Sequence, residues 1–535
     1  MRGDGPGVAG GAKVEAGAAA PGVITKASCY ALGLLAFANF LNYLDRSIFS
    51  ILAEAIKTDL RLDDAQLGFL LGTAFAIFYS IVGIAMGGIS DRLSRKKVMA
   101  IGLALWSSMT MLGGAATNLL TLGIARLGVG IGEATANPCS HSLVSQIFPR
   151  RNRSLALSTY LTGAYVGGAA SMIVGGYMLQ HWSGGLCASV PIAGACGLAA
   201  WKAALLTVGL PGLPVALLVL TIREPARPRR DERGTLSTIV DEFSTVIPPF
   251  TLIGIQRSAG TAGLMSNFAI AAAIAVVAGL IAWATGDKVQ WMALGIGAYS
   301  VITWGQIRKY RDLPFFRLTY GDRSFLLLIV GTSLLACIIG TVSTWSAPYL
   351  MRTYSLSPVQ IGLALGLTHT LGTVIGLISG GWLVDRWKVR NPGAPILMCL
   401  IALFMVAPAL IAMLLLHNVT AFIIAYGVLS IFSSFWSGGI AATVQDLVTP
   451  RMRGAASSCY SLVVTIIMSG LGPYWVGRVS KMTGSLETGL LSILLLAPFA
   501  LVTLILLLRA LRVQTPERRE AVAAAAGELV TAPHF

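Results

Sequence analysis

Residues 67–92 have the sequence LGFLLGTAFAIFYSIVGIAMGGISDR, and a second version of this stretch occurs later in the chain. Residues 361–386, IGLALGLTHTLGTVIGLISGGWLVDR, align on it without a gap. The identical positions include Gly68 and Gly362, Gly72 and Gly366, Gly87 and Gly381, Asp91 and Asp385, and Arg92 and Arg386. Each copy is an apolar run long enough to cross a bilayer as a helix. The chain therefore contains two related halves.

The composition places both halves in a membrane. Of the 535 residues, 55% are hydrophobic and 12% are charged, and the mean hydropathy is +0.75, which excludes an ordinary soluble domain with a polar surface. Lipid offers the backbone no hydrogen-bond partner, so membrane spans must be helices or a closed barrel, and apolar runs of about 20 residues fit only helices. We predict an all-α, polytopic membrane protein.

Hydropathy predicts fourteen membrane-spanning helices. Their ranges are 28–52, 66–90, 97–116, 118–146, 154–178, 201–222, 262–284, 289–306, 323–350, 358–383, 393–416, 418–447, 454–478 and 485–510. Six helices precede a basic linker and six follow residue 323, so the pair at 262–306 is an insertion between two six-helix bundles. Parallel repeats of this kind build alternating-access carriers, in which the halves rock about a central site.

The domain boundaries follow from these spans. We expect a disordered tail at 1–27, a first bundle at 28–222, a linker at 223–261, the inserted pair at 262–306, a second bundle at 323–510 and a tail at 511–535. In the linker, Ile239, Phe243 and Val246 have helical spacing, which predicts an amphipathic helix on the membrane surface. Cys187 and Cys196 share a predicted outer loop, where they form either a disulfide or two free thiols.

The net charge of +16 is a topology signal and does not indicate nucleic-acid binding, because the basic residues concentrate in alternate loops. Examples are Arg92, Arg95, Lys96, Lys97, Arg150, Arg151, Arg153, Arg386, Arg451 and Arg453. The positive-inside rule assigns these loops and both termini to the cytoplasm. We expect a monomeric, multi-pass protein of the cell membrane, or of the inner membrane in a bacterium, surrounded by membrane lipids.

Asp45 and Glu133 are the acidic side chains that fall deep inside apolar segments, and each lies near an isolated arginine. These arginines are Arg46 and Arg126. A charge at the centre of a membrane helix costs roughly 2.5–3.5 kcal/mol on insertion scales, so four cost on the order of 10 kcal/mol unless they meet partners or water. The four residues are therefore the strongest functional candidates.

Two segments resemble the signature of the major facilitator superfamily. GGISDRLSRKK (87–97) and GGWLVDR (380–386) match its pattern G-x-x-x-D-R followed by basic residues. The resemblance implies the major facilitator fold, here with two extra transmembrane helices between the bundles, and a latch at the cytoplasmic gate. The latch residues would be Gly87, Asp91, Arg92, Gly381, Asp385 and Arg386. Ser94 replaces the usual glycine of the signature, and a positive-inside loop without a gating role is the alternative.

A narrower resemblance is to the Spinster-type carriers of lysolipids and sphingolipids. It rests on NYLDRS (42–47) and ARLGVGIGEA (125–134). The resemblance implies that Asp45 and Glu133 couple transport to protons, with Glu133 as the main proton carrier.

The geometry of one helix excludes pairing between neighbours, because Asp45 and Arg46 point about 100° apart. Pairing must therefore be between helices, and we expect Arg46 to meet Glu133. Asp45 would lie toward Arg126 across the cavity. Desolvation disfavours a buried carboxylate and an arginine favours it, so protonation can change as the cavity opens to each side. A static ion-pair clasp between the helices is the alternative.

The second half lacks equivalent charges. The repeat position of Asp45 is Ile339, and that of Glu133 is Ser434. The cavity candidates are polar or aromatic residues within the spans: Asn42, Tyr79, Tyr165, Trp345, Tyr349, His369, Thr370, Trp436 and Tyr460. An apolar vestibule beside two arginines suits an amphipathic anion with a phosphate or carboxylate head. His369 is predicted to be a hydrogen-bonded core or cavity residue and not a proton carrier.

The sequence thus predicts a secondary active transporter and not an enzyme. It would move a lysophospholipid or sphingoid phosphate by alternating access, driven by protons. The alternatives are a proton-coupled carrier of a small organic anion and, from another class, an intramembrane hydrolase, which would need a nucleophile or activated water between its acids. The motifs of nucleotide and zinc sites do not occur, so we expect no cofactor, no metal site and no ATP-driven pumping.

Overall fold

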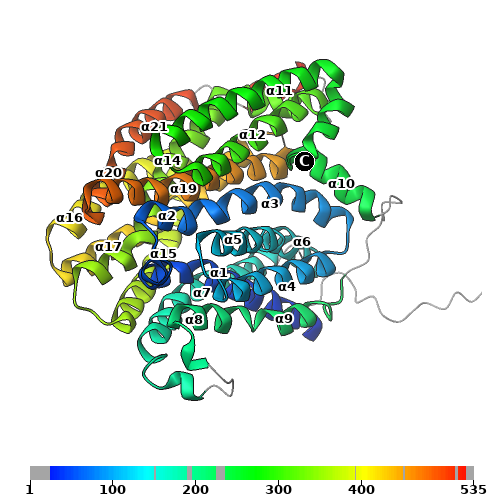
Figure 1. Ribbon diagram of the computed structural model, residues 1–535. Helices are drawn as coiled ribbons and strands as arrows, with labels where there is room; N and C mark the ends of the chain where they lie inside the picture. Colours follow the sequence, from blue (N-terminus) through cyan, green and yellow to red (C-terminus); the bar gives the residue numbers. More distant parts are fainter. Residues whose placement is uncertain are drawn as a thin grey trace, which may run out of the picture.

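The computed structural model describes residues 25–149, 152–189, 195–224, 235–391, 393–449, 452–511 and 516–525. Within these ranges the regular elements are all helices, and most of them run along one common direction (Figure 1). The predicted fold class is confirmed. Most of both predicted tails and the basic residues Arg150, Arg151 and Arg451 lie outside the described residues.

The first bundle corresponds to the first six predicted spans. It contains α1 (Lys26–Leu60), α2 (Asp64–Gly68), a π-helix (Phe69–Thr73), α3 (Ala74–Arg92), α4 (Arg95–Gly114), α5 (Leu119–Glu133), α6 (Ala136–Ile147), α7 (Arg153–His181), α8 (Ala200–Gly209) and α9 (Gly212–Val219). α2, the π-helix and α3 follow one another directly and make one long span, whereas a two-residue break separates α5 from α6.

The second bundle repeats this plan. It contains α14 (Arg323–Thr353), α15 (Pro358–Lys388), α16 (Ala394–Leu415), α17 (Val419–Ser434), α18 (Ser437–Asp446), α19 (Arg453–Thr483), α20 (Leu486–Ser492), a 3-10 turn (Ile493–Leu496) and α21 (Ala497–Leu511), and α22 (Pro516–Ala525) follows it. The repeat extends to the helix caps. Asp63 and Gln66 form a capping box at the start of α2, and Ser357 and Gln360 form one at the equivalent start of α15.

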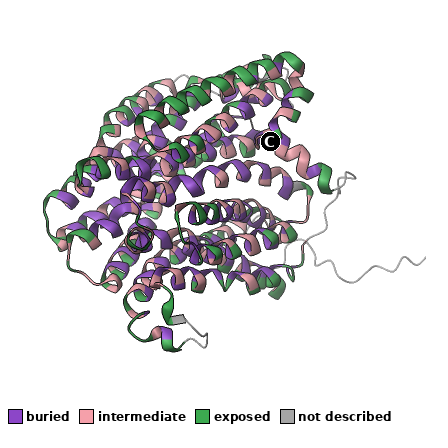
Figure 2. Cartoon of the chain, viewed as in Figure 1, coloured by how far each residue is buried: buried purple, intermediate pink, exposed green. Residues whose placement is uncertain are grey.

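Four helices connect the bundles: α10 (Thr235–Val246), α11 (Thr251–Thr285), α12 (Lys288–Arg311) and α13 (Leu313–Leu318). α10 is the amphipathic linker helix, and α11 and α12 are the inserted pair. α11 bends at Gly260, whose φ of 63° lies in the left-handed region that glycine tolerates. The outward face of α11 is exposed over most of its length (Figure 2), as expected for a helix that faces lipid.

Eleven helical stretches are long and apolar enough to cross a membrane in the part of the chain that the structure describes. α4, α7 and α12 are not among them, so their crossing remains a prediction from the sequence. We call the end of the molecule that carries Arg92, Lys97 and Lys388 the basic end, and the end that carries Asp64 and Arg352 the outer end. In Figure 1 α10 lies at the basic end, on the right.

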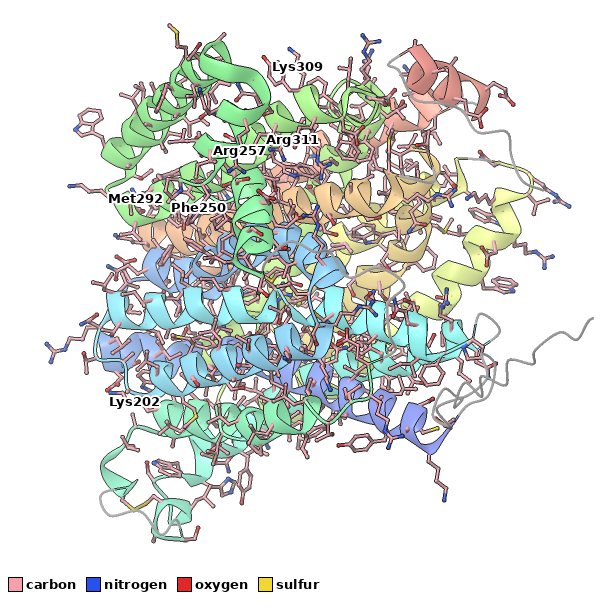
Figure 3. The ribbon with its side chains drawn as sticks, turned by 90° about the vertical axis from the view of Figure 1, so that its right-hand side faces the viewer. Lys202, Phe250, Arg257, Met292, Lys309 and Arg311 are labelled. Atoms are coloured by element: carbon pink, nitrogen blue, oxygen red, sulfur yellow. A yellow bond between two sulfur atoms is a disulfide. The ribbon has the colours of Figure 1, made fainter. Side chains whose placement is uncertain are left out.

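Basic residues also gather where the inserted pair reaches the basic end. Arg257 of α11 and Lys309 and Arg311 of the last turn of α12 are labelled in the upper middle of Figure 3, whereas Lys202 and Met292, from the opposite end, are labelled at its left. This placement agrees with the positive-inside interpretation of the insertion, which adds two helices and leaves the orientation of the second bundle unchanged.

Candidate transport cavity and charged cluster

An ion-pair network joins the two halves at the outer end. Arg352 of α14 donates from Nη1 and Nη2 to the two carboxylate oxygens of Asp64 in α2, both at 2.8 Å, and lies 2.7 Å from Glu54 of α1. Lys57 Nζ lies 2.6 Å from the same Asp64 carboxylate, and the Ser480 hydroxyl of α19 donates to it at 2.5 Å. Sequence reasoning missed this network, because its residues lie at the ends of spans, where charges are ordinary.

Close backbone contacts also hold the outer end together. A Cβ on Gly72 would collide with the Ser469 carbonyl oxygen, and a Cβ on Gly68 would collide with that of Pro473. On the other side of the bundle, Gly176 of α7 lies against the backbone of α15 in the same way. Glycine allows two helices to approach this closely. The two halves are therefore tightly packed at the outer end.

A central cavity of about 470 Å³ lies between the halves below this closure. Its lining from the first half includes Tyr43, Arg46, Ser47, Phe49, Ser50, Phe75, Arg126 and Tyr165. Its lining from the second half includes Ser343, Thr344, His369, Thr370, Thr373, Tyr426, Ser433, Ser434, Ser437 and Ser469. A second cavity of about 430 Å³ shares Tyr43 with the first and continues past His141 and Ser457 toward the basic end. The conformation is therefore closed at the outer end.

The two predicted proton-coupling acids are both buried beside this cavity. Asp45 is 2% exposed and accepts a hydrogen bond from the hydroxyl of Thr110 in α4. Glu133 is 1% exposed; the Asn42 side chain of α1 lies beside its carboxylate, but no hydrogen bond of good geometry from a described residue reaches either oxygen. Glu133 ends α5 at the break before α6. A buried carboxylate without a fixed donor is costly as an anion and is a group suited to taking up a proton.

The two arginines face the cavity and rest on aromatic rings. The Arg46 guanidinium lies 4.8 Å from the centre of the Phe75 ring and 5.2 Å from that of Tyr79. Arg126 lies 4.0 Å from the Phe49 ring and 5.2 Å from the Phe75 ring. Phe75 therefore contacts both cations through its π-face. Nε and Nη1 of Arg126 have no hydrogen-bond partner among the described residues.

The expected ion pair between Arg46 and Glu133 is not formed, since none of the salt bridges in the described part of the chain joins them and Arg46 contacts aromatic rings instead. For Asp45 the prediction is only that it lies toward Arg126, and these two charges act on each other without a direct ion pair. Asp45 accepts from the Thr110 hydroxyl, and Arg126 contacts the Phe49 ring. The four residues do converge, since the charges of Asp45 and both arginines act on Glu133. The alternative of a static ion-pair clasp between the helices is also absent from this conformation, because no ion pair joins these four described residues.

The predicted cavity residues divide into two groups. Tyr165, His369 and Thr370 line the central cavity, and Tyr79 lines the second cavity. The remaining candidates, Asn42, Trp345, Tyr349, Trp436 and Tyr460, line neither. Packing explains the four aromatic residues, because large aromatic side chains in membrane bundles fill helix contacts, whereas Asn42 is buried beside Glu133.

Trp345 and Tyr349 illustrate this correction. Trp345 is fully buried and donates to the Pro473 carbonyl at 3.1 Å, while Tyr349 stacks on Phe422. Both are helix-packing residues near the outer end. His369 lines the cavity and lies 3.3 Å from the Ser430 hydroxyl.

Sequence reasoning also missed most of the small polar lining. On α1 the lining residues Tyr43, Arg46, Ser47 and Ser50 are spaced as one helical face. This spacing can be read from the sequence. Once Arg46 is assigned to the cavity, the spacing predicts that Tyr43, Ser47 and Ser50 line it too. Hydroxyl residues in the second half carry no comparable signal, because serine and threonine also occur throughout helix contacts.

The latch prediction needs a correction at its glycines. Gly87 and Gly381 face open space, whereas their neighbours make the close contacts: Gly88 lies against the Glu242 carboxylate of α10, and Gly380 lies against the Phe435 carbonyl. The rotation of each helix about its own axis decides which of two adjacent glycines contacts a neighbouring residue, and the signature sequence does not determine that rotation.

The contacts described for the arginines of the latch join them to α10 and to their own helix. Arg92 lies 3.4 Å from Glu242, and Arg386 lies over the Trp382 ring at 5.6 Å. Asp385 is exposed and forms no ion pair or hydrogen bond with any described residue. The side chain of Asp91 lies outside the described residues.

The inserted helices attach to both halves. Asp287, between α11 and α12, accepts from the Tyr474 hydroxyl at 2.7 Å and lies 3.2 Å from Arg478, both in α19. Gln290 of α12 donates to the Gly470 carbonyl at 2.9 Å, and Thr73 of the first half donates to the same oxygen at 2.6 Å. α12 therefore lies over the line where the first half meets α19.

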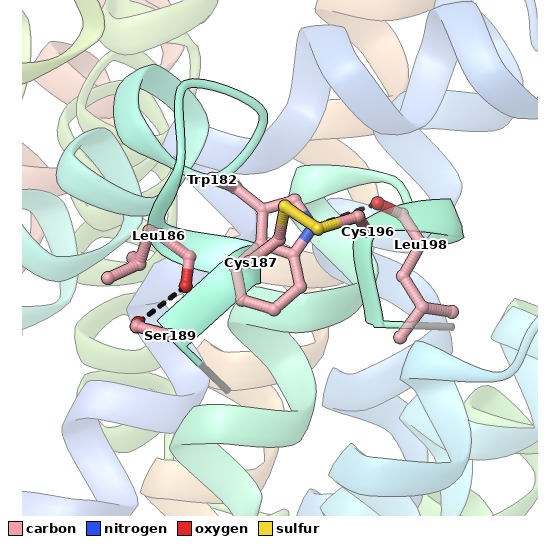
Figure 4. The surroundings of a disulfide bond; sticks show 6 residues. All are labelled: Trp182, Leu186, Cys187, Ser189, Cys196 and Leu198. Carbon is pink, nitrogen blue, oxygen red and sulfur yellow. Dashed lines mark hydrogen bonds between the residues drawn. A yellow bond between two sulfur atoms is a disulfide. The ribbon is translucent and has the colours of Figure 1, made fainter. Parts of the chain in front are cut away.

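The outer loop after α7 contains a disulfide between Cys187 and Cys196 (Figure 4). Trp182 closes the base of this loop by donating from its ring nitrogen to the Leu198 carbonyl at 2.9 Å. The disulfide decides between the two alternatives that the sequence left open. A disulfide at this position is consistent with an outer end that faces an oxidising compartment.

The chain was compared with known proteins. The sequence profile of the Major Facilitator Superfamily matches residues 35–473 and 328–533. An "MFS-type efflux pump" of Mycolicibacterium smegmatis is 28% identical over 459 residues, which are 84% of each chain. A solved bacterial homologue of the human lysosomal transporter Spinster, in an inward-facing and unoccupied conformation, has a TM-score of 0.68 at 21% identity and covers 91% of this chain and 98% of its own.

Two relatives that match shorter stretches have names that state a substrate. The sphingosine-1-phosphate transporter SPNS2 of Danio rerio is 28% identical over 209 residues, 38% of each chain. A probable L-galactonate transporter of Escherichia coli is 30% identical over 188 residues, 35% of this chain and 37% of its own. The profile match extends over most of the chain and agrees with the two-bundle fold. The chain therefore belongs to the major facilitator superfamily, a family of membrane transporters, and is similar to its Spinster-type members.

Proposed function

We propose that this transporter moves an amphipathic anion, of the lysophospholipid or sphingoid phosphate class, by alternating access coupled to protons. The observation that carries the proposal is the central cavity, in which both arginines come from the first half and no charged side chain comes from the described residues of the second. An anionic head would bind at Arg46 and Arg126, and a tail would lie against Leu71, Met172 and Met468.

The proton would be carried by Glu133, with Asp45 in support. When the substrate leaves the arginines, an ionised Glu133 can turn toward them. When the substrate occupies the arginines, Glu133 has no cation to pair with, so its protonated form is favoured. The Glu133 carboxylate and the substrate anion would thus alternate at the same pair of cations. The break between α5 and α6 directly after Glu133 gives this side chain a place to move.

Alternation would require the outer network to open. In the opposite conformation Arg352 would separate from Asp64, and the latch residues at the basic end would engage across the halves. The free Asp385 carboxylate of the present conformation is available for this. We expect the protein to act as a monomer in the cell membrane, with the basic end in the cytoplasm.

The test is uptake into proteoliposomes of wild type and of Glu133→Gln and Asp45→Asn, measured for sphingosine-1-phosphate and lysophosphatidic acid at two external pH values. We expect both variants to lose most of the pH-dependent uptake. Asp446→Asn is the matched control, because that carboxylate is 51% exposed and pairs with Lys388 at the basic end. Wild-type rates and wild-type pH dependence in Glu133→Gln would refute the coupling mechanism.

A small organic anion is the second candidate, and the hydroxyl groups of the cavity favour it. Ser343, Thr344, Ser433, Ser434 and Ser437 would hydrogen-bond a hydrophilic molecule well. The relative named as a probable L-galactonate transporter supports the same class. Competition decides between the two: if galactonate blocks uptake of the labelled lipid at low concentration and is itself transported, the substrate is the small anion.

A further inference from the structure

A second, separate groove lies on the outside of the first bundle at the basic end. It has a volume of about 450 Å³ and is formed by α3, α4 and α5 on one side and by the amphipathic helix α10 on the other. Its walls are mainly apolar and include Ile89, Leu105, Ile239 and Phe243. Ile101, on the same wall, is 69% exposed, so the groove opens toward the surroundings of the bundle, which in a membrane are lipid tails.

Two cations border this groove. Arg92 and Lys97 both line it, and both side chains reach the surface. Arg92 shares its charge with Glu242, 3.4 Å away, whereas Lys97 forms no ion pair with any described residue. Lys97 therefore supplies a cation without an ion-pair partner among the described residues, at the edge of an apolar trough, which is complementary to a molecule with an anionic head and an apolar tail.

A third observation points to a ligand. Thr238 of α10 lines the groove and is 1% exposed, yet its hydroxyl has no hydrogen-bond partner among the described residues. A buried hydroxyl normally has such a partner, because leaving it unpaired costs free energy. An oxygen of a molecule in the groove would supply the partner.

We propose that the groove binds one anionic phospholipid of the adjacent leaflet. The phosphate lies at Arg92 and Lys97, a glycerol ester oxygen accepts from Thr238, and one acyl chain lies between α4 and α10. A soluble anion would use the cations but would gain nothing from the apolar walls. A zwitterionic lipid would make the same apolar contacts with the walls, but its head group would be attracted less strongly to Arg92 and Lys97.

The rear wall connects this lipid to the central site. Ile131 and Gly132, in the last turn of α5, and Thr135, in the break between α5 and α6, line the groove on either side of Glu133. A lipid there restricts how that break can bend. On the basis of the proposed function, we therefore expect the lipid to alter the rate of proton-coupled transport, while its binding itself does not depend on transport.

The test measures binding first. Purified protein is titrated with dioleoyl phosphatidylglycerol and, separately, with dioleoyl phosphatidylcholine by native mass spectrometry. We expect tighter binding of the anionic lipid, about fivefold weaker binding in Lys97→Gln and about threefold weaker binding in Thr238→Val. Lys309→Gln is the matched control, an exposed lysine at the same end that lies outside the groove. Ile239→Trp, which fills the trough, should lower the binding of both lipids.

Unchanged binding of phosphatidylglycerol in both Lys97→Gln and Thr238→Val would overturn the proposal, as would equal binding of the two lipids to wild type. A second arm measures uptake in vesicles with and without phosphatidylglycerol. Weaker lipid binding in Lys97→Gln together with an unchanged transport rate rejects the effect of the lipid on transport and leaves the lipid site in place. Normal lipid binding with no transport of any tested anion rejects the proposed function alone.

Discussion

Arg352 and Asp64 lie 288 residues apart in the sequence and form a two-point ion pair across the two halves of the molecule. The Asp64 side chain is 9% exposed and that of Arg352 is 24% exposed, so the pair is partly shielded from solvent. Bidentate, charge-assisted hydrogen bonds of this kind are among the stronger polar contacts in proteins. This pair is therefore a main polar contribution to the closure of the outer end.

Replacing Arg352 by glutamine should shift the protein toward conformations that are open at the outer end. The loss leaves Asp64 without its bidentate partner and costs about 2 kcal/mol, allowing for the partial exposure of the pair. A cysteine at Ser47, which lines the central cavity, should then react faster with a membrane-impermeant maleimide added from the outer side.

Lys481→Gln is the control for this experiment, because the Lys481–Asp63 pair joins the same two regions but its side chains are 41% and 31% exposed. We expect little change in labelling for that variant. Equal labelling rates in Arg352→Gln and wild type would show that the ion pair does not hold the outer end closed.

Phe75→Leu should weaken substrate binding, because Phe75 holds both cavity arginines in place through its ring. Leucine keeps the side chain apolar but removes both cation–π contacts, and we expect the KM for uptake to rise about fivefold. Phe37→Leu provides the comparison, since Phe37 is 46% exposed and stacks on Phe40 without contacting an arginine. If the two variants have the same KM, the ring does not position the arginines.

Thr110→Val should change the pH dependence of transport. The Thr110 hydroxyl donates to the buried Asp45 carboxylate and so favours its charged form. Without that donor the protonated form is favoured, and the pH profile of uptake should move toward higher pH. Thr110→Ser keeps the hydroxyl and should retain the wild-type profile; a shift in both variants, or in neither, would contradict this role for the hydrogen bond.

Gly72→Ala should destabilise the present conformation, because its new methyl group would collide with the Ser469 carbonyl across the halves. Overpacking of this kind costs about 1–3 kcal/mol, so the melting temperature in detergent should fall by several degrees. Gly83→Ala is the matched control within the same long span, since a Cβ there has nothing within 4 Å. A melting temperature that is unchanged in Gly72→Ala would indicate that the outer ends of the halves are not in contact in solution.

The fold could be predicted well from the sequence because its strongest signals are long and redundant. Apolar runs, basic loops and the repeated segment all indicate the same two bundles, and the capping residues at Asp63 and Ser357 continue the repeat. The grouping of Asp45, Glu133 and the two arginines was also predictable, because isolated charges in apolar helices must find each other or water.

The details of the site could not be predicted, since they depend on helix rotation and tilt. The sequence could not indicate that Gly88 and Gly380, and not their neighbours, make the close contacts. Nor could it indicate that the arginines rest on Phe49 and Phe75, because the sequence does not place these rings relative to the guanidinium groups.

The position of α12 also limits how the halves can turn relative to each other. Gly297 of α12 lies against Ile77 of α3 and Ile466 of α19, so this one helix is packed on both halves at once. Rotation about an axis close to α12 leaves these contacts in place, whereas rotation about a distant axis would break them. Under the proposed alternating access, we therefore expect an asymmetric movement in which α7 and α15 separate by the largest distance, which would give a molecule dissolved in the bilayer a lateral route into the cavity.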